Sequence, residues 1–188
     1  LRKSGLRPGD RLVLTKGIGT GTLFAAEMRM RAKGRWIDGA IQAMRQSSRA
    51  AAAALRRHGA TACTDVTGFG LLGHLVEMTK ASGVDARLAL SSVPVLDGAL
   101  ETSGAGLLSS LHPHNVRLRR AVADVERAAT DPRYPLLYDP QTAGGLLAGV
   151  PADRADACVD DLHAQGYDQA VVIGSVEPRG DAAPIHVE

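Results

Sequence analysis

The 188-residue sequence has few cysteines, few aromatic residues and little net charge. Its two cysteines, Cys63 and Cys158, lie far apart and neither belongs to a Cys-x-x-Cys pair, which argues against a disulfide scaffold and a structural zinc site. Cys63 lies in an apolar stretch, so we interpret it as a small buried hydrophobe rather than a nucleophile. Aromatic residues make up only 3% of the chain, so no aromatic platform for stacking single-stranded nucleic acid is evident.

Charge and hydropathy exclude two further classes of partner. The 22 basic and 20 acidic residues leave a net charge of +2, too little for the electrostatic footprint of a nucleic-acid-binding protein. No run of 18 apolar residues and no basic, apolar leader occurs, so we expect no membrane association and a cytoplasmic location. The hydrophobic content of 45% is ordinary for a globular protein, and the length suits one domain.

Apolar periodicity and turn residues predict strands interleaved with helices. We expect strands at 10–15, 60–63, 86–90, 146–150, 170–176 and 184–187, the last two as a hairpin. Helices are expected at 22–32, 37–58, 71–82, 93–102, 116–129 and 151–165, with a loop at 103–115. Because the spacing is not that of strict βαβ units, the pattern predicts an α+β fold with a mixed β-sheet and packed helices.

The segment from Thr64 to Met78 carries the strongest signal for chemistry. Asp65 follows an apolar strand, and Gly68 and Gly70 allow backbone conformations closed to other residues before an amphipathic helix begins. A helix N-terminus favours phosphate or carboxylate, and a carboxylate beside it can hold a divalent cation. The alternative is that Asp65 or Thr67 merely caps the helix.

Two glycine clusters imitate nucleotide-binding motifs. Gly68-Phe-Gly-Leu-Leu-Gly73 matches the dinucleotide fingerprint. Asp65, however, would repel a pyrophosphate, and the next strand ends in Ser91-Ser92 where a ribose-binding acid is expected. The cluster Lys16-Gly-Ile-Gly-Thr-Gly-Thr22 lacks the Gly-Lys-Ser/Thr of a Walker A loop, so we interpret it as a strand-to-helix turn.

Three motifs in order give the chain a specific resemblance. They are Leu14-Thr-Lys-Gly-Ile-Gly-Thr-Gly21, Asp65-Val-Thr-Gly-Phe-Gly-Leu-Leu-Gly-His74 and Asp139-Pro-Gln-Thr-Ala-Gly-Gly-Leu-Leu147. Together they resemble the C-terminal half of selenophosphate synthetase (selenide, water dikinase), of the aminoimidazole ribonucleotide synthetase superfamily. One departure is Leu111-His-Pro-His-Asn115, where the family often has a Gly-Gly-Thr-Arg-Asn-like stretch.

The resemblance implies a fold and an activity. The fold is the C-terminal α+β domain of aminoimidazole ribonucleotide synthetase, over residues 10–188, with residues 1–9 as the remnant of an interdomain linker. The activity is the conversion of ATP, selenide and water to selenophosphate, AMP and phosphate. The partner is an N-terminal half of the same protein that binds most of the ATP, and the full-length protein is expected to form a homodimer.

The resemblance also implies roles for particular residues. Asp65 is expected to contribute to a Mg²⁺ cluster, since metal ions neutralise charge in phosphoryl transfer. Thr67, Gly68 and Gly70 are expected to shape a phosphate-facing turn, and Lys16 to offer charge near it. No catalytic base or nucleophile is assigned within the chain, which is therefore expected to be inactive alone.

Two alternatives stay open. The chain could belong to another ATP-dependent enzyme of the same superfamily, or it could be a noncatalytic module that lends structure or regulation to a fused partner. An assay that compares selenide with other phosphoryl acceptors distinguishes selenophosphate synthetase from another enzyme of the superfamily. A neighbouring coding sequence for a glycine-rich, ATP-binding half would favour the enzyme over the noncatalytic module.

Overall fold

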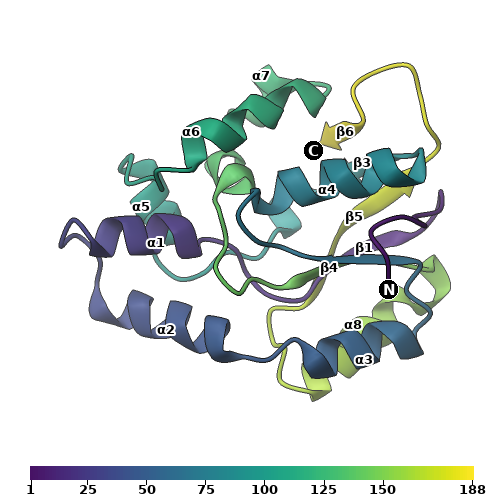
Figure 1. Ribbon diagram of the computed structural model, residues 1–188, viewed down its shortest axis with the longest axis horizontal. Helices are drawn as coiled ribbons and strands as arrows, with labels where there is room; N and C mark the ends of the chain where they lie inside the picture. The colour runs from purple at the N-terminus through teal and green to yellow at the C-terminus, as the bar shows by residue number, and fades with distance from the viewer.

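The computed structural model describes residues 1–188 and contains one six-stranded sheet with helices on both faces (Figure 1). The strands are β1 (Arg11–Leu14), β2 (Ala62–Asp65), β3 (Asp85–Leu88), β4 (Leu146–Val150), β5 (Val171–Glu177) and β6 (Ile185–Val187). Their order across the sheet is β2-β4-β1-β5-β3-β6, and all neighbours are antiparallel except β3 and β6, which are parallel. The prediction of an α+β fold with a mixed sheet is therefore confirmed.

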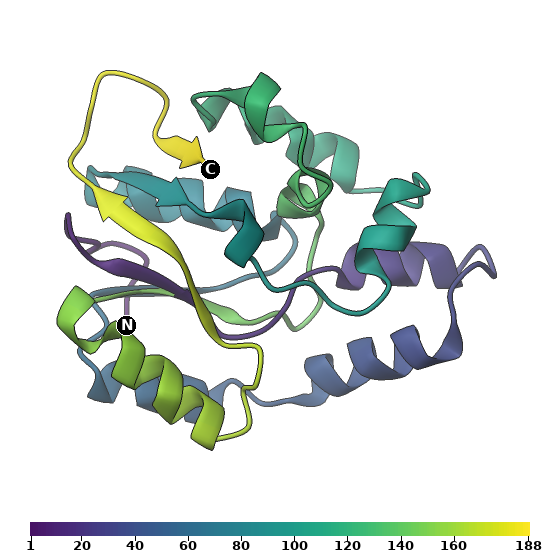
Figure 2. The ribbon, with the colours of Figure 1, turned by 180° about the vertical axis from the view of Figure 1, so that it is seen from behind.

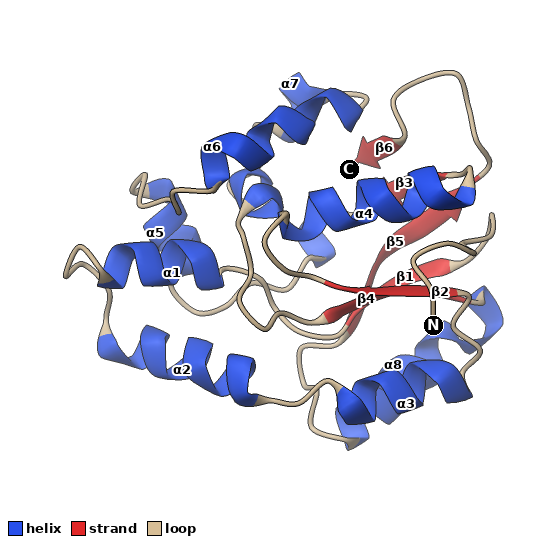
Figure 3. Ribbon diagram, viewed as in Figure 1, coloured by secondary structure: helices blue, strands red, loops and turns tan.

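Eight α-helices and four short 3₁₀ segments surround this sheet (Figure 3). The α-helices are α1 (Thr20–Glu27), α2 (Gly34–Arg45), α3 (Arg49–Arg57), α4 (Gly70–Ser82), α5 (Ala99–Gly104), α6 (His112–Asn115), α7 (Val125–Ala128) and α8 (Ala155–Ala164). The 3₁₀ segments are η1 (Leu90–Ser92), η2 (Val116–Ala121), η3 (Tyr134–Tyr138) and η4 (Ala152–Arg154). None of the helices combines the length and the apolar character needed to cross a bilayer.

The sheet separates two hydrophobic cores. Along β1, Leu12 and Leu14 point into the larger core and Val13 into the smaller one, as the period of two of a strand requires. Helix α4 packs on the larger core, and α3 and α8 lie together on the opposite face (Figure 2). Helices α1 and α2 extend beyond one end of the sheet, on the side where β2 ends and β4 begins (Figure 1).

Four of the predicted helices are wrong in extent. The helix expected at 22–32 is α1, which ends at Glu27. The helix expected at 37–58 is two helices, because Gln46 has an extended backbone between α2 and α3. The segment expected to be helical from Pro94 begins as extended chain, and only α5 is helical there. The Ile18 N–H donates to the Pro94 carbonyl, and the Leu96 N–H donates to the Ile18 carbonyl. The stretch 116–129 forms η2 and α7 rather than one helix.

The predicted hairpin at the C-terminal end is also wrong. Strand β6 pairs with β3 in parallel instead of with β5. The buried carboxylate of Asp85 explains this course, because it accepts hydrogen bonds from Arg179 Nη1 at 2.7 Å and from the Gly180 N–H at 2.9 Å. These bonds hold the connecting segment at the start of β3, and the chain then returns along the far side of that strand.

Candidate functional site

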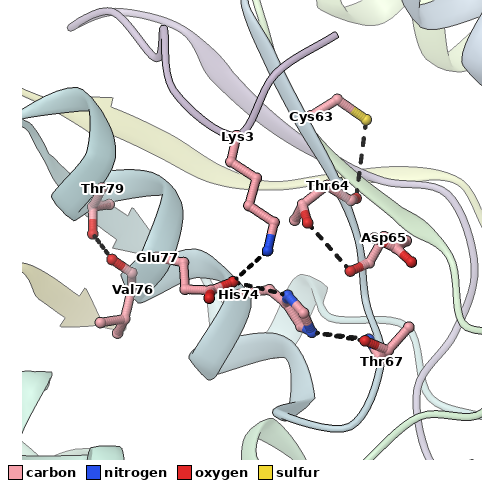
Figure 4. Close-up of polar contacts among 9 residues, drawn as sticks. All are labelled: Lys3, Cys63, Thr64, Asp65, Thr67, His74, Val76, Glu77 and Thr79. Atoms are coloured by element: carbon pink, nitrogen blue, oxygen red, sulfur yellow. Dashed lines mark hydrogen bonds and ion pairs between the residues drawn. The ribbon is translucent and has the colours of Figure 1, made fainter.

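Asp65 is the last residue of the edge strand β2, next to a glycine-containing turn at 65–70. Its side chain is exposed and makes no hydrogen bond and no ion pair within the chain (Figure 4). The backbone around it is fixed, since Asp65 is paired with Leu146 in the sheet and the Val66 N–H donates to the Gly145 carbonyl. A free carboxylate on a rigid backbone is available to a cation without the loss of an internal partner.

The capping interpretation of Asp65 and Thr67 is wrong. Helix α4 has Phe69 at its N-cap position, and no side chain caps it. Thr67 faces His74 instead: its N–H donates to His74 Nε2 at 3.1 Å, and its hydroxyl lies 3.2 Å from the same nitrogen. The Thr67 carbonyl accepts from the N–H groups of Gly70 and Gln141.

The two glycines of the turn have different reasons to be glycine. Gly70 has a φ of 71°, and a Cβ there would lie 2.8 Å from the Leu137 carbonyl oxygen, so the fold itself requires it. A Cβ on Gly68 would meet nothing within 4 Å. The N–H groups of Gly68 and Phe69 donate no hydrogen bond within the chain. Gly68 therefore keeps an open approach to unpaired backbone donors.

Gly68 lines a hollow of about 550 Å³ beside the turn. Other residues that line it include Thr20, Phe24, Met28, Ser109, Gln141 and Thr142. The hollow thus joins the three sequence motifs, since Thr20 belongs to the first, Gly68 to the second and Gln141 to the third.

The first and third motifs are joined directly by hydrogen bonds. Gln141 Oε1 accepts from the N–H groups of Gly19 and Thr20 at 2.9 and 3.2 Å, and Asp139 Oδ2 accepts from the Gly21 N–H at 2.9 Å. These acceptors cap the N-terminus of α1, which has no cap from its own N-cap residue. Asp139 is fully buried, and this burial raises the pKa of its carboxyl to about 7.

Asn115 holds the turn from the other side and was missed by the sequence analysis. Its Nδ2 donates to the carbonyl oxygens of Gly68 and Tyr138 at 2.8 and 3.0 Å, and its side chain is buried. The segment at 111–115 departs from the family pattern but keeps Asn in its last position. That retained Asn was the available signal.

Lys16 lines a different hollow from Gly68. Its ammonium group is buried and donates to the carbonyl oxygens of Ala43, Gln46 and Ala143 at 2.9, 2.7 and 3.2 Å. Burial lowers the pKa of Lys16. Its three N–H donors are thus committed to backbone, two of them at the C-terminal end of α2. A phosphate contact from Lys16 stays a prediction, and it requires these bonds to open.

The remaining candidate groups do not assemble into a metal or nucleophile site. No group of three or more His, Cys, Asp or Glu side chains is close enough together to hold a metal ion. His112 Nε2 lies 3.0 Å from the Pro135 carbonyl oxygen. Burial raises the pKa of Cys63 to about 11, which keeps the thiol protonated at neutral pH and agrees with its interpretation as a small hydrophobe.

Comparison with known proteins agrees with these motifs. Residues 7–187 match the family model described as AIR synthase related protein, C-terminal domain. A selenide, water dikinase from Clostridioides difficile (strain 630) is 36% identical over 185 residues, which cover 96% of this chain and 52% of that protein. One from Porphyromonas gingivalis (strain ATCC 33277) is 39% identical over 186 residues, covering 98% and 53%. The chain thus spans about half the length of these relatives.

Solved structures share the fold at low sequence identity. Hydrogenase maturation protein HypE in complex with ATP superposes with a TM-score of 0.64 at 18% identity, covering 99% of this chain and 49% of that one. Thiamine monophosphate kinase from Aquifex aeolicus gives 0.58 at 17% identity, covering 100% and 53%. From the family match over nearly its whole length, the chain belongs to the AIR synthase related proteins, as their C-terminal domain.

Proposed function

We propose that this chain is the C-terminal half of an ATP-dependent selenophosphate synthetase, which forms selenophosphate, AMP and phosphate from ATP, selenide and water. Residues 1–9 are then the remnant of the linker to an N-terminal half, and the whole protein is a cytoplasmic homodimer. Support comes from the relatives named selenide, water dikinase, which are 36% and 39% identical over almost the whole of this chain. Their greater length supports an N-terminal partner that carries most of the ATP site.

The observation that carries the proposal is the unpartnered carboxylate of Asp65 beside the open turn. A carboxylate is a ligand that Mg²⁺ prefers, and Asp65 has no cap, salt bridge or hydrogen bond that explains its presence. A single carboxylate can supply only one ligand of a metal site, so the proposal places the other ligands on the N-terminal half. A bound Mg²⁺ would neutralise charge on the phosphate oxygens.

The neighbouring residues fit a phosphate group. The unpaired N–H groups of Gly68 and Phe69 are donors that an anion can use, and the absence of a Cβ at Gly68 lets it come close. Thr67 and Gly70 shape the turn, held by His74 and by the backbone of η3. No residue of the chain is assigned as catalytic acid, base or nucleophile.

The test is Asp65→Asn in the full-length protein. Loss of the charge weakens binding of a hard cation, so we expect selenide-dependent ATP turnover to fall by about 10²-fold or more at limiting Mg²⁺. Because the side chain is exposed and makes no hydrogen bond or ion pair within the chain, the melting temperature should stay within about 2 °C of the wild type. Asp97→Asn, on another exposed and unpartnered carboxylate, is the matched control.

Any of three results contradicts the proposal. Normal turnover of Asp65→Asn at limiting Mg²⁺ removes Asp65 from the metal site. ATP turnover that is stimulated by another phosphoryl acceptor, and not by selenide, assigns the chain to a different enzyme of the superfamily. A full-length protein with no ATP turnover under any acceptor supports the noncatalytic module instead.

A further inference from the structure

The first six residues form an N-terminal strap that is tied to β2 and to the middle and the C-terminal end of α4. The Arg2 carbonyl accepts from the Cys63 N–H at 2.8 Å, beside the otherwise free edge of the sheet. Ser82 Oγ accepts from the N–H groups of Gly5 and Leu6 at 3.0 and 3.1 Å, at the C-terminal end of the helix. Between these points Lys3 reaches over α4 (Figure 4).

From Lys3, a line of polar contacts leads to the turn that carries Asp65. Lys3 Nζ donates to Glu77 Oε2 at 2.9 Å, and the same oxygen lies 3.4 Å from His74 Nδ1. His74 Nε2 accepts from the Thr67 N–H at 3.1 Å. Figure 4 shows these four side chains in one row, with Asp65 two residues before Thr67.

The contact with Thr67 fixes the protonation of His74. A ring nitrogen that accepts from a backbone N–H carries no proton, so His74 is neutral and its proton is on Nδ1. Nδ1 then faces the Glu77 carboxylate. Burial lowers the pKa of His74, in agreement with the neutral form. The imidazole is only 4% exposed, so water cannot replace the Thr67 N–H as the donor to Nε2 unless the ring moves.

Glu77 and Lys3 differ from His74 in exposure. Their side chains are 42% and 50% exposed, and such an ion pair adds little to global stability. Its effect is local, because it determines where the Glu77 carboxylate lies relative to Nδ1. The strap is therefore linked to the backbone of the turn through one buried ring.

We propose that His74 is a positioning residue for the Asp65 turn, and that the N-terminal strap sets its orientation through Lys3 and Glu77. The proposal rests on the function proposed above, in which Asp65 binds Mg²⁺. A shift of the strap would rotate the imidazole, release the Thr67 N–H and loosen the turn that presents the carboxylate. The strap thereby connects the chain upstream of residue 6 with the geometry of the site.

The first test is NMR spectroscopy of the 188-residue chain, which needs no activity. We expect the ¹⁵N shifts of His74 to show the Nδ1–H tautomer. Glu77→Leu should speed amide exchange at Thr67 by about tenfold, because a hydrogen bond of ordinary strength is weakened. Lys80→Ala, which removes an exposed and unpartnered charge on the same helix, should leave Thr67 unchanged.

Rescue separates positioning from general packing. His74→Gln places an amide oxygen near the site of Nε2 and should keep the protection of Thr67, whereas His74→Leu should lose it. If His74→Leu does not fold, the rates of amide exchange at Thr67 in Glu77→Leu and Lys80→Ala still test the proposal. An Nε2–H tautomer in the wild type, or unchanged exchange at Thr67 in Glu77→Leu, would overturn the proposal.

The second test is the Mg²⁺ dependence of the full-length protein. Glu77→Leu should raise the Mg²⁺ concentration for half-maximal turnover by several-fold, with melting temperature close to that of Lys80→Ala. An unchanged Mg²⁺ dependence contradicts the link to the site. If the NMR results hold but selenide supports no turnover, the proposed function fails while the positioning of the turn by His74 stands.

Discussion

At the scale of the residue, the buried polar groups of the first and third motifs bind one another, whereas Asp65 of the second motif is exposed and has no partner. Gln141 and Asp139 cap α1, and Asn115 holds Gly68, so residues from three distant segments fix the walls of one hollow. Sequence reasoning placed Asp65 and both glycines in one turn before a helix, as the structure has them, and their roles toward metal and phosphate stay predictions. It did not identify Asn115 or the capping role of Asp139, because a partner more than twenty residues away leaves no local pattern.

The raised pKa of Asp139 predicts how the free energy of unfolding depends on pH. This pKa in the folded chain is about 7, above the ordinary 3.8, so the folded state binds more protons than the unfolded state between these values. Stability from this group is therefore greatest below about pH 4 and is lost as the pH rises to about 7. Asp139→Asn keeps an acceptor for the Gly21 N–H and does not titrate. We expect it to remove up to about 4 kcal/mol of this pH dependence.

Urea unfolding at a series of pH values from 4.5 to 8 is the measurement. The free energy of unfolding of Asp139→Asn should approach or exceed that of the wild type as the pH rises. Asp97→Asn, an exposed carboxylate without a partner, should follow the wild type throughout. Parallel curves for the wild type and Asp139→Asn would show that Asp139 does not titrate in this range.

At the scale of the element, the sequence predicted a boundary correctly where the residues that end the helix or strand lie at that boundary. Helix α4 ends at Ser82, before the left-handed Gly83 that serves as its C-cap, as predicted from sequence. The break between α2 and α3 was missed although Ser47 and Ser48 are residues typical of a helix start, and the Ser47 hydroxyl accepts from the Arg49 N–H. The alanine run that favours helix lies wholly within α3, and Lys16 from another segment binds the carbonyls at the break. Likewise, the partner of β6 depends on Asp85, nearly a hundred residues away.

Lys16 gives the prediction at this scale. In Lys16→Met the aliphatic stem remains, but three backbone carbonyls at the end of α2 and in the 142–145 loop lose a charged donor. We expect the free energy of unfolding to fall by about 2–4 kcal/mol. Lys80→Met, on an exposed face, should change it by less than about 0.5 kcal/mol.

The same variant separates structure from chemistry at this position. Urea unfolding gives the stability, and hydrogen exchange at residues 43–48 shows whether the junction of α2 and α3 opens. If Lys16→Met were as stable as the wild type yet reduced turnover of the full-length protein, Lys16 would act near phosphate, as predicted from sequence. Its bonds to the carbonyls at the end of α2 would then not be what makes it important.

At the scale of the molecule, the chain has one six-stranded sheet and two cores, and no cluster of metal ligands. The sequence predicted the α+β class, because alternating elements without βαβ spacing favour a mixed sheet. It could not predict the strand order, which depends on contacts between distant segments. The relatives that match nearly all of this chain are about twice as long, and the proposed function assigns the other metal ligands to the part that the chain does not cover.

The chain alone should therefore bind ATP poorly. At the turn it offers the free carboxylate of Asp65 and the unpaired N–H groups of Gly68 and Phe69, with no cluster of metal ligands and no Walker lysine. Such a partial site cannot offset the loss of translational and rotational freedom on binding, so we expect a Kd weaker than about 1 mM. Titration calorimetry of the 188-residue chain with ATP and Mg²⁺ measures this, with the full-length protein as the control. Micromolar binding by the chain alone would mean that it contains a complete nucleotide site, and that the division of the ATP site between two halves is wrong.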